Sequence, residues 1–247
     1  MTLSPSSAHL TQRVDMRTIV LERDGLLPTL ADLWWAGPKP RAVAWVFDGQ
    51  VLRDSAVRAA WPAGVAAVGV HGTANRDAEY AHARDPRPSC ALRSEPRGWA
   101  HARAMNLAAQ TTDLSSIGVD AHTPRLAVGA SLGGLAAMLC AVASPSHWRG
   151  VVGLSPSVGW ARETDPISKR WIRQVGDRCA LYLDAGGATE ADDNRWAVNA
   201  MAQELRRVGL RRWTAPTFPG AAHAWSAWAG RVGPALEWAL DLRGAIE

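Results

Sequence analysis

Residues 125–143 read RLAVGASLGGLAAMLCAVA, and this stretch decides the fold class of the chain. It begins with a short apolar run typical of a buried β-strand and ends in an alanine- and leucine-rich run typical of a helix. Between the two runs, residues 129–133 have the pattern Gly-x-Ser-x-Gly. The stretch therefore predicts a strand, a sharp turn that carries Ser131, and a helix.

Apolar runs of strand length alternate with helix-length segments on both sides of this stretch. Continuous apolar runs are typical of parallel strands that are buried on both faces. Their alternation with helices predicts an α/β fold with a mostly parallel central sheet and helices on both faces. We expect strands at residues 41–47, 64–70, 125–129, 150–154, 179–184 and 213–218, and helices at 99–110, 132–143, 194–208 and 232–242.

The last helix, the proline-rich region and the domain bounds can also be predicted. Pro234 favours the first turn of a helix, so we expect the last helix to begin close to it. Residues 76–124 hold many prolines and charges, which predicts a long loop before the helix at 99–110. The chain has 247 residues, of which 47% are hydrophobic, enough for one large core. We therefore expect a flexible lead-in at residues 1–15 and one domain at 16–247.

Composition argues against several other classes of protein. Cys90, Cys140 and Cys179 are widely and irregularly spaced, so we expect neither a disulfide framework nor a metal site. Neither a secretory signal nor a membrane-spanning run is visible, which predicts a cytoplasmic protein without a membrane partner. The net charge of +4 comes from arginines scattered along the chain, so we expect no nucleic-acid partner. A mild positive field would still favour an anionic substrate.

Ser131 is the candidate nucleophile. Gly129 and Gly133 allow the backbone to turn sharply, which would expose the serine hydroxyl above the sheet. The N–H of Leu132 would then face the oxyanion that forms during acyl transfer. A glycine-rich turn without chemistry is the alternative, but a strand before the motif and a helix after it favour a catalytic serine.

His223 is the candidate general base, because it follows the last expected strand and precedes the last helix. In this type of fold the chain order is serine, acid, histidine. The acid should follow the strand at 179–184, where Asp184, Glu190, Asp192 and Asp193 are all available. Asp184 lies within the expected strand, and Asp192 and Asp193 suit the start of a helix. We favour Glu190, and the other three carboxylates stay open.

Several motifs resemble the enterochelin esterase and esterase D family of α/β-hydrolases. They are residues 129–135 around Ser131, residues 153–157 with Trp160, residues 219–225 around His223 with Trp228, residues 47–50, and residues 76–80. The resemblance covers residues 41–242 and implies a single-domain α/β-hydrolase. It also implies that Gln50 supplies the second oxyanion N–H and that Glu190 is the acid. One departure is clear, because the family usually has Asp after the histidine and this chain has Ala224.

The predicted function is that of a serine esterase. His223 would take the proton of Ser131, and the resulting acyl-enzyme would be released by water. The substrate would be a small ester, lactone or thioester, with a siderophore as one family example, and no cofactor or metal is needed. Trp160, Trp225 and Trp228 would form an apolar wall of the substrate pocket.

Two other functions stay open at this point. Release of the acyl group by an alcohol or amine would make the protein an acyltransferase or a cyclising thioesterase. A ligand-binding module could keep the same fold without catalysis. We expect a monomer or homodimer in either case.

Overall fold

The computed structural model describes residues 16–37, 39–85, 87, 91–160, 167–187 and 194–241, so the expected lead-in at residues 1–15 lies outside the described residues. Eight strands form one sheet within these ranges. They are β1 (Arg17–Leu21), β2 (Thr29–Trp34), β3 (Ala42–Phe47), β4 (Val65–Val70), β5 (Arg125–Ala130), β6 (Gly150–Leu154), β7 (Ala180–Leu183) and β8 (Trp213–Thr214).

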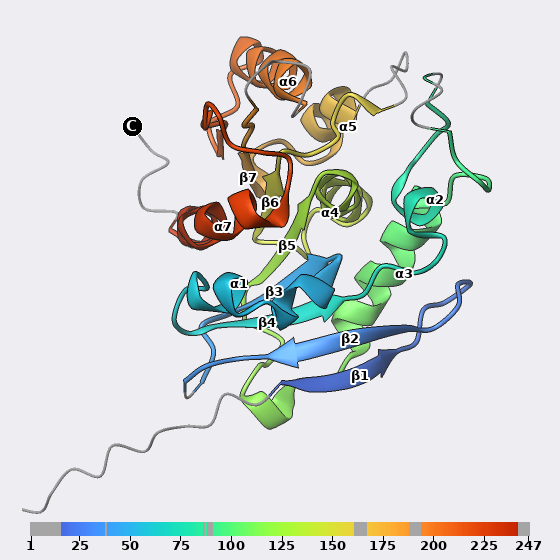
Figure 1. Cartoon of the computed structure of the whole chain (residues 1–247), viewed down its shortest axis with the longest axis vertical. Coiled ribbons are helices and arrows are strands. Elements are labelled where there is room, and N and C mark those ends of the chain that lie inside the picture. Colours follow the sequence, from blue (N-terminus) through green and yellow to red (C-terminus); the bar gives the residue numbers. More distant parts are fainter. Residues whose placement is uncertain are drawn as a thin grey trace, which may run out of the picture.

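The strands lie in the order β1-β2-β4-β3-β5-β6-β7-β8, and all neighbours from β4 to β8 pair in parallel. The six strands expected from the sequence are therefore present, and the mostly parallel α/β fold is confirmed (Figure 1). β8 is shorter than expected. The residues that follow β8 pair with those that follow β7 at one isolated bridge, between Ala185 and Thr217.

The sequence reading missed β1 and β2, which pair antiparallel to each other and to β4 at one edge of the sheet. These strands are not continuous apolar runs. In β1, Leu21 is buried whereas Val20 is 61% exposed. An edge strand with one face in water gives a weak alternating pattern, which is harder to recognise than a buried parallel strand.

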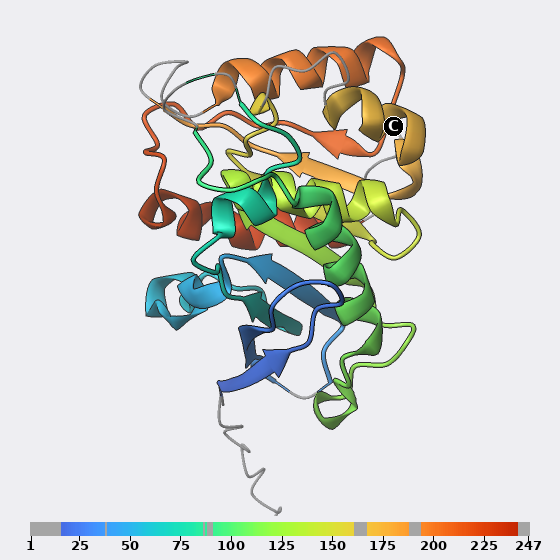
Figure 2. The ribbon, with the colours of Figure 1, turned by 90° about the vertical axis from the view of Figure 1, so that its right-hand side faces the viewer.

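Helices cover both faces of the sheet (Figures 1 and 2). One face carries α1 (Ser55–Ala59) and α7 (Trp225–Leu240), and the 3₁₀ turn η1 (Gly49–Arg53) follows β3. The opposite face carries the other five α-helices of the described chain. These are α2 (Arg76–Tyr80), α3 (Gly98–Thr111), α4 (Leu132–Ala143), α5 (Ile167–Gln174) and α6 (Arg195–Arg207).

The last helix corrects one prediction, because α7 begins at Trp225 and Pro234 lies inside it. Trp225, Trp228, Ala229 and Val232 have helical spacing and pack against the sheet, so their burial fixes the start of the helix before the proline. The region expected to be a long loop before α3 also contains α2. That helix has only five residues, too few for a periodic pattern.

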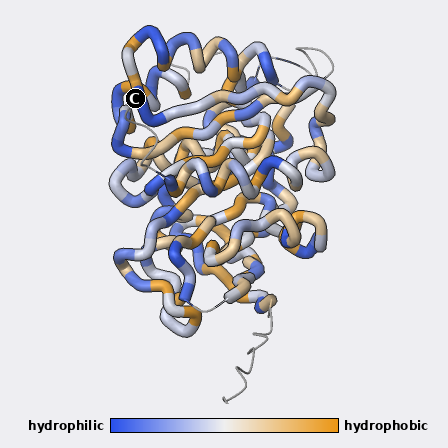
Figure 3. The backbone as a smooth tube through the Cα atoms, turned by 90° about the vertical axis from the view of Figure 1, so that its left-hand side faces the viewer, coloured by the Kyte–Doolittle hydropathy of each residue, from blue (hydrophilic) through white to orange (hydrophobic). Residues whose placement is uncertain are grey.

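The strands divide their side chains between two apolar clusters, one on each face of the sheet. In β3, Val43, Trp45 and Phe47 face the α3–α4 side, whereas Ala44 and Val46 face α7. In Figure 3, hydrophobic segments lie inside the molecule, and hydrophilic segments lie along the outer helices and loops. Burial on both sides leaves the carboxyl ends of the strands as the place where loops and polar groups gather.

Candidate active site

Ser131 occupies the sharp turn between β5 and α4. Its φ of 54° and ψ of −125° lie outside the regions that non-glycine residues normally adopt. Close packing enforces this turn, because a Cβ on Gly129 would lie 2.3 Å from the backbone of Gly133. A Cβ on Gly134 would lie 2.7 Å from Pro156. The glycines are therefore required by contacts, as a nucleophile elbow demands.

The backbone of Ser131 is tied to the end of β6. Its N–H donates to the Leu154 carbonyl at 3.0 Å, and its carbonyl accepts from the Ser157 N–H at 3.0 Å. The residue itself is half-buried. These bonds hold the strained turn in one conformation and leave the side chain at the carboxyl edge of the sheet.

Two backbone N–H groups are available near this turn. Leu132 is the first residue of α4, and Gln50 lies in η1. Within the described part of the chain, neither N–H donates a hydrogen bond. The two segments touch, because a Cβ on Gly133 would lie 3.2 Å from the Asp48 carboxylate. The arrangement can thus offer two donors to one developing oxyanion.

Asp48 shapes the turn that carries Gln50. It has a φ of 60°, and its carboxylate accepts from Arg76 at 2.9 Å. The Asp48 N–H donates to the Tyr80 hydroxyl at 3.2 Å. Burial and then the Asp48 charge raise the pKa of Tyr80, so this hydroxyl stays protonated. Gly49 is required here, since its Cβ would overlap the backbone of Gly69.

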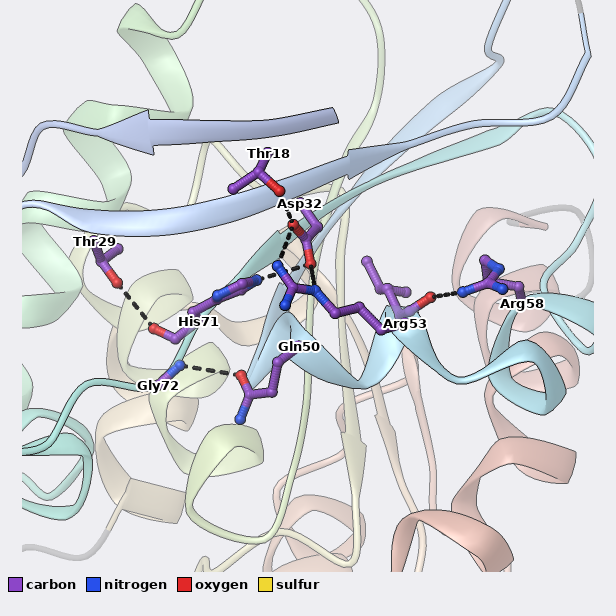
Figure 4. Close-up of polar contacts among 9 residues, drawn as sticks. Thr18, Thr29, Asp32, Gln50, Arg53, Arg58, His71 and Gly72 are labelled. Atoms are coloured by element: carbon purple, nitrogen blue, oxygen red, sulfur yellow. Dashed lines mark hydrogen bonds and ion pairs between the residues drawn. The ribbon is translucent and has the colours of Figure 1, made fainter. Parts of the chain in front are cut away.

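A second network, around Asp32 in the middle of β2, holds the far end of the same turn (Figure 4). The buried Asp32 carboxylate accepts from Arg53 at 2.7 Å and from Thr18 at 2.7 Å, and His71 Nε2 lies 2.9 Å away. Burial alone would raise the pKa of Asp32, but hydrogen bonds from Arg53, Thr18 and His71 outweigh it and lower the pKa to about 2.

The residue that follows His71 also contacts Gln50, whose backbone N–H is a candidate oxyanion donor. The N–H of Gly72, next to His71, donates to the Gln50 side chain at 3.2 Å. The sequence reading missed Asp32 and His71 as parts of the site. A signal was present, because Asp32 is a single carboxylate within the otherwise mostly apolar strand TLADLW, and a buried charge needs partners.

His223 lies in the loop between β8 and α7, with an exposed side chain. Its ring meets the edge of Trp228, with ring centres 4.8 Å apart. The loop is fastened to the segment after β7. The Gly187 N–H donates to the Ala221 carbonyl, and the Gly220 N–H donates to the Gly187 carbonyl. The segment that leaves Gly187 toward the candidate acids therefore starts beside the histidine loop.

Of the four candidate acids, only Asp184 lies within the described residues. Asp184 is fully buried; its Oδ1 accepts from the Ser155 N–H at 2.7 Å, and its Oδ2 lies 3.5 Å from Arg231 Nε. These contacts give Asp184 a structural role. The other three carboxylates, Glu190, Asp192 and Asp193, lie outside the described residues.

The three tryptophans expected to line the pocket do not form one wall. Trp160 packs in the cluster on the α3–α4 face, and its indole N–H donates to the Ala83 carbonyl at 2.8 Å. Trp225 and Trp228 lie on the α7 face, with ring centres 5.5 Å apart. Trp228 is buried, and its indole N–H donates to the Ser155 hydroxyl at 3.1 Å. Trp225 is only half-buried.

Two further observations concern metal binding and membrane crossing. Across the described ranges, no group of three or more His, Cys, Asp or Glu side chains could hold a metal ion. The longest apolar helices among the described residues are too short or too polar to cross a bilayer.

Comparison with known proteins identifies the family of this chain. Residues 107–238, more than half of the chain, match the model of the Esterase family, described as "Putative esterase". Comparison with curated protein sequences gives no significant match.

Solved structures with the same fold include an IroE-like serine hydrolase from Shewanella oneidensis, with a TM-score of 0.69 and 17% identity over 91% of this chain and 80% of that chain. The enterobactin esterase FES from Shigella flexneri has a TM-score of 0.64 and 17% identity over 93% of this chain; this chain spans only 59% of that protein. The siderophore hydrolase EstB from Aspergillus nidulans has a TM-score of 0.63 and 16% identity over 98% of this chain and 99% of that chain. The family match shows that this chain belongs to the esterase family, and the similar structures show that it has the α/β-hydrolase fold.

Proposed function

We propose that this protein is a serine esterase that cleaves an ester or lactone bond of a siderophore-like small molecule through an acyl-enzyme on Ser131. The observation that carries the proposal is the strained backbone of Ser131, at φ 54°, next to the available N–H groups of Leu132 and Gln50. Strain of this kind persists where the surrounding structure enforces it, and it gathers at active sites.

The proposed reaction has two steps. His223 accepts the hydroxyl proton while Ser131 Oγ attacks the ester carbonyl, and the N–H groups of Leu132 and Gln50 bind the oxyanion. The C–O bond then breaks, and His223 returns the proton to the leaving alcohol. In the second step His223 takes a proton from water, the resulting nucleophile attacks the acyl carbonyl, and Ser131 recovers its proton as the acid is released.

Glu190 is the proposed acid that orients His223. The support is local, because Gly187 bonds to Ala221, two residues before His223, and Glu190 follows three residues after Gly187. Asp184 is held by Ser155 and Arg231. Asp192 and Asp193 stay as alternatives that mutation can separate from Glu190.

The proposed substrate class draws on similar structures and on the aromatic side of the site. The Shigella esterase was solved in the presence of 2,3-dihydroxy-N-benzoyl-serine. In this chain, the half-buried Trp225 beside Trp228 offers an aromatic surface close to His223. An acyl or aryl group could pack there while its ester reaches Ser131.

A fluorophosphonate probe tests the nucleophile. We expect covalent labelling of the wild-type protein, detected by intact mass, and no labelling of Ser131→Ala. Ser226→Ala, an exposed serine of α7, is the matched control and should label normally. Labelling that survives in Ser131→Ala, or a wild-type protein that neither labels nor cleaves short esters and lactones, would contradict the proposal.

Product analysis tests the acyl acceptor. Hydrolysis predicts free acid as the main product from short esters, lactones and thioesters. An alcohol or amine, added at a concentration far below that of water, separates the alternatives. If most of the acyl group goes to the added nucleophile at low concentration, the protein is an acyltransferase instead.

A further inference from the structure

Five neighbouring parallel strands each enter the sheet next to an arginine. Arg125 is the first residue of β5, while the others directly precede their strands or, at β7, lie two residues before it. Neighbouring strands are about 4.8 Å apart, so the five side chains start along a line of roughly 20 Å. We call this set the arginine row: Arg41 at β3, Arg125 at β5, Arg149 at β6, Arg178 at β7 and Arg212 at β8.

Backbone hydrogen bonds fix the spacing of the row. The Arg149 N–H donates to the Arg125 carbonyl at 2.8 Å, and the Arg149 carbonyl accepts from Ala180 in β7. The Arg212 carbonyl accepts from Leu181. The row therefore lies at the amino edge of the sheet, opposite the carboxyl edge that carries Ser131.

A hollow of about 700 Å³ opens along the row. Four members of the row line it, Arg212 being the exception, together with His122 and His147. Among its lining residues in the described chain, none is Asp or Glu. Of the acidic groups nearby, Asp120 binds Lys39 at 3.2 Å, whereas Glu237 binds Arg41 of the row. Apart from Arg41, the arginines that line the hollow have no ion pair with an acidic side chain among the described residues.

The charges of the arginine row and of His147 destabilise one another. Burial lowers the pKa of Arg125, and burial together with the neighbouring Arg212 lowers the pKa of Arg149. Burial and Arg125 lower the pKa of His147 to about 4. Arg125 Nε and Arg212 Nη2 are buried without a hydrogen-bond acceptor in the described structure. An anion placed here would satisfy donors and reduce the repulsion.

We propose that the arginine row is a binding site for a small multivalent anion that carries phosphate groups. Guanidinium groups bind phosphate with two parallel hydrogen bonds, and phosphate brings several negative charges into a small volume. The hollow has the size of a small-molecule pocket. Its concave shape favours a small anion over the extended backbone of a nucleic acid. This site is separate from the proposed ester chemistry.

Calorimetric titration with inorganic pyrophosphate at constant ionic strength tests the site. We expect Arg149→Gln and Arg125→Gln each to weaken binding at least tenfold, and Arg149→Lys to weaken it less. Arg103→Gln, an exposed arginine of α3, is the control and should bind like the wild type. Circular dichroism melting verifies that each variant is folded, and Arg149→Gln should cleave esters at the wild-type rate.

Four results would overturn the proposal. One is the absence of pyrophosphate binding by the wild-type protein, and another is equal binding by folded Arg149→Gln, Arg125→Gln and the wild type. The third is a duplex oligonucleotide that binds through the same arginines and is not displaced by pyrophosphate. Sodium citrate in a parallel titration distinguishes phosphate groups from carboxylates, and citrate binding tighter than pyrophosphate would also count against a phosphate site.

Discussion

At the scale of single residues, the candidate site depends on glycines, which have no side chain, as much as on Ser131. The β5–α4 turn closes only because Gly129 has no Cβ, since a methyl group on Gly129 would overlap the backbone of Gly133. Such a clash cannot be relieved by a side-chain rotation. The strain at Ser131 is thus maintained by its glycine neighbours.

Gly129→Ala should therefore unfold the elbow locally. We expect a loss of about 3 kcal/mol in the free energy of unfolding, with esterase activity and fluorophosphonate labelling both abolished. Gly230→Ala is a sharp control, because nothing lies within 4 Å of the added Cβ in α7. That change should stabilise the protein by about 0.5–1 kcal/mol. Equal effects of the two substitutions in urea denaturation would refute this account of the turn.

Glu190→Gln tests the proposed acid at the same scale. If Glu190 orients His223, kcat should fall about 10⁴-fold, because the amide favours the wrong imidazole tautomer. Asp192→Asn and Asp193→Asn should retain most activity. A large loss of kcat in Asp192→Asn or Asp193→Asn, with Glu190→Gln still active, would show that the mutated aspartate is the acid that orients His223.

At the scale of elements, η1 is held at both ends, by Arg76 on Asp48 and by Asp32 on Arg53. The Asp32 contacts join β1, β2, the end of β4 and η1 (Figure 4). Because Gln50 lies between the two anchors, the position of its N–H depends on both. We regard Asp32 as a positioning residue for the proposed oxyanion site.

Asp32→Asn should loosen this turn. We expect a loss of about 2 kcal/mol in stability and at least a tenfold fall in kcat with little change in KM. Asp54→Asn is the matched control. Asp54 is exposed and caps the N-terminus of α1, and Asn caps a helix as well as Asp does. Wild-type kcat in Asp32→Asn would show that η1 holds its position without the network.

The same carboxylate gives a pH signature. The pKa of Asp32 is about 2 in the folded protein and 3.8 in the unfolded chain, so its ionised form stabilises the fold above pH 4. That contribution is lost as the pH falls from about 4 to 2. The stability difference between wild type and Asp32→Asn should shrink across this window in urea denaturation.

The elements show where sequence reasoning succeeds and where it stops. β3 and β5 are buried on both faces, so their apolar runs predicted them within one residue. β1 and α2 are short and half in water, and their composition carries little signal. Ser131 and the glycines were visible because their spacing is local. The partners of Asp32 lie 14 to 39 residues away and could not be read from the sequence.

At the scale of the whole molecule, the core contains a histidine that acid should destabilise. His101 is buried between Phe47 and Tyr80, and burial, followed by the charge of Arg23, lowers its pKa from 6.5 to about 3. The unfolded chain binds a proton at this group below pH 6.5, whereas the folded protein does not. His101 therefore makes stability fall as the pH drops from about 6.5 to 3.

The free energy of unfolding should fall by about 1 kcal/mol or more per pH unit within this range. His101→Phe should flatten the slope between pH 6.5 and 4.5, and His122→Gln, in an exposed loop, should leave it unchanged. Urea denaturation at three pH values measures the slope. An unchanged slope in folded His101→Phe would show that other groups control the acid response.

The sequence alone determined the parallel sheet, the strand–turn–helix around Ser131 and the family, because apolar periodicity and a five-residue motif are local properties. The tertiary structure decided the rest. Arg125 and Arg149 are far apart among many scattered arginines, yet sheet order brings them side by side at one edge. Strand pairing sets which distant charges share a site, and no local pattern in the chain records that pairing.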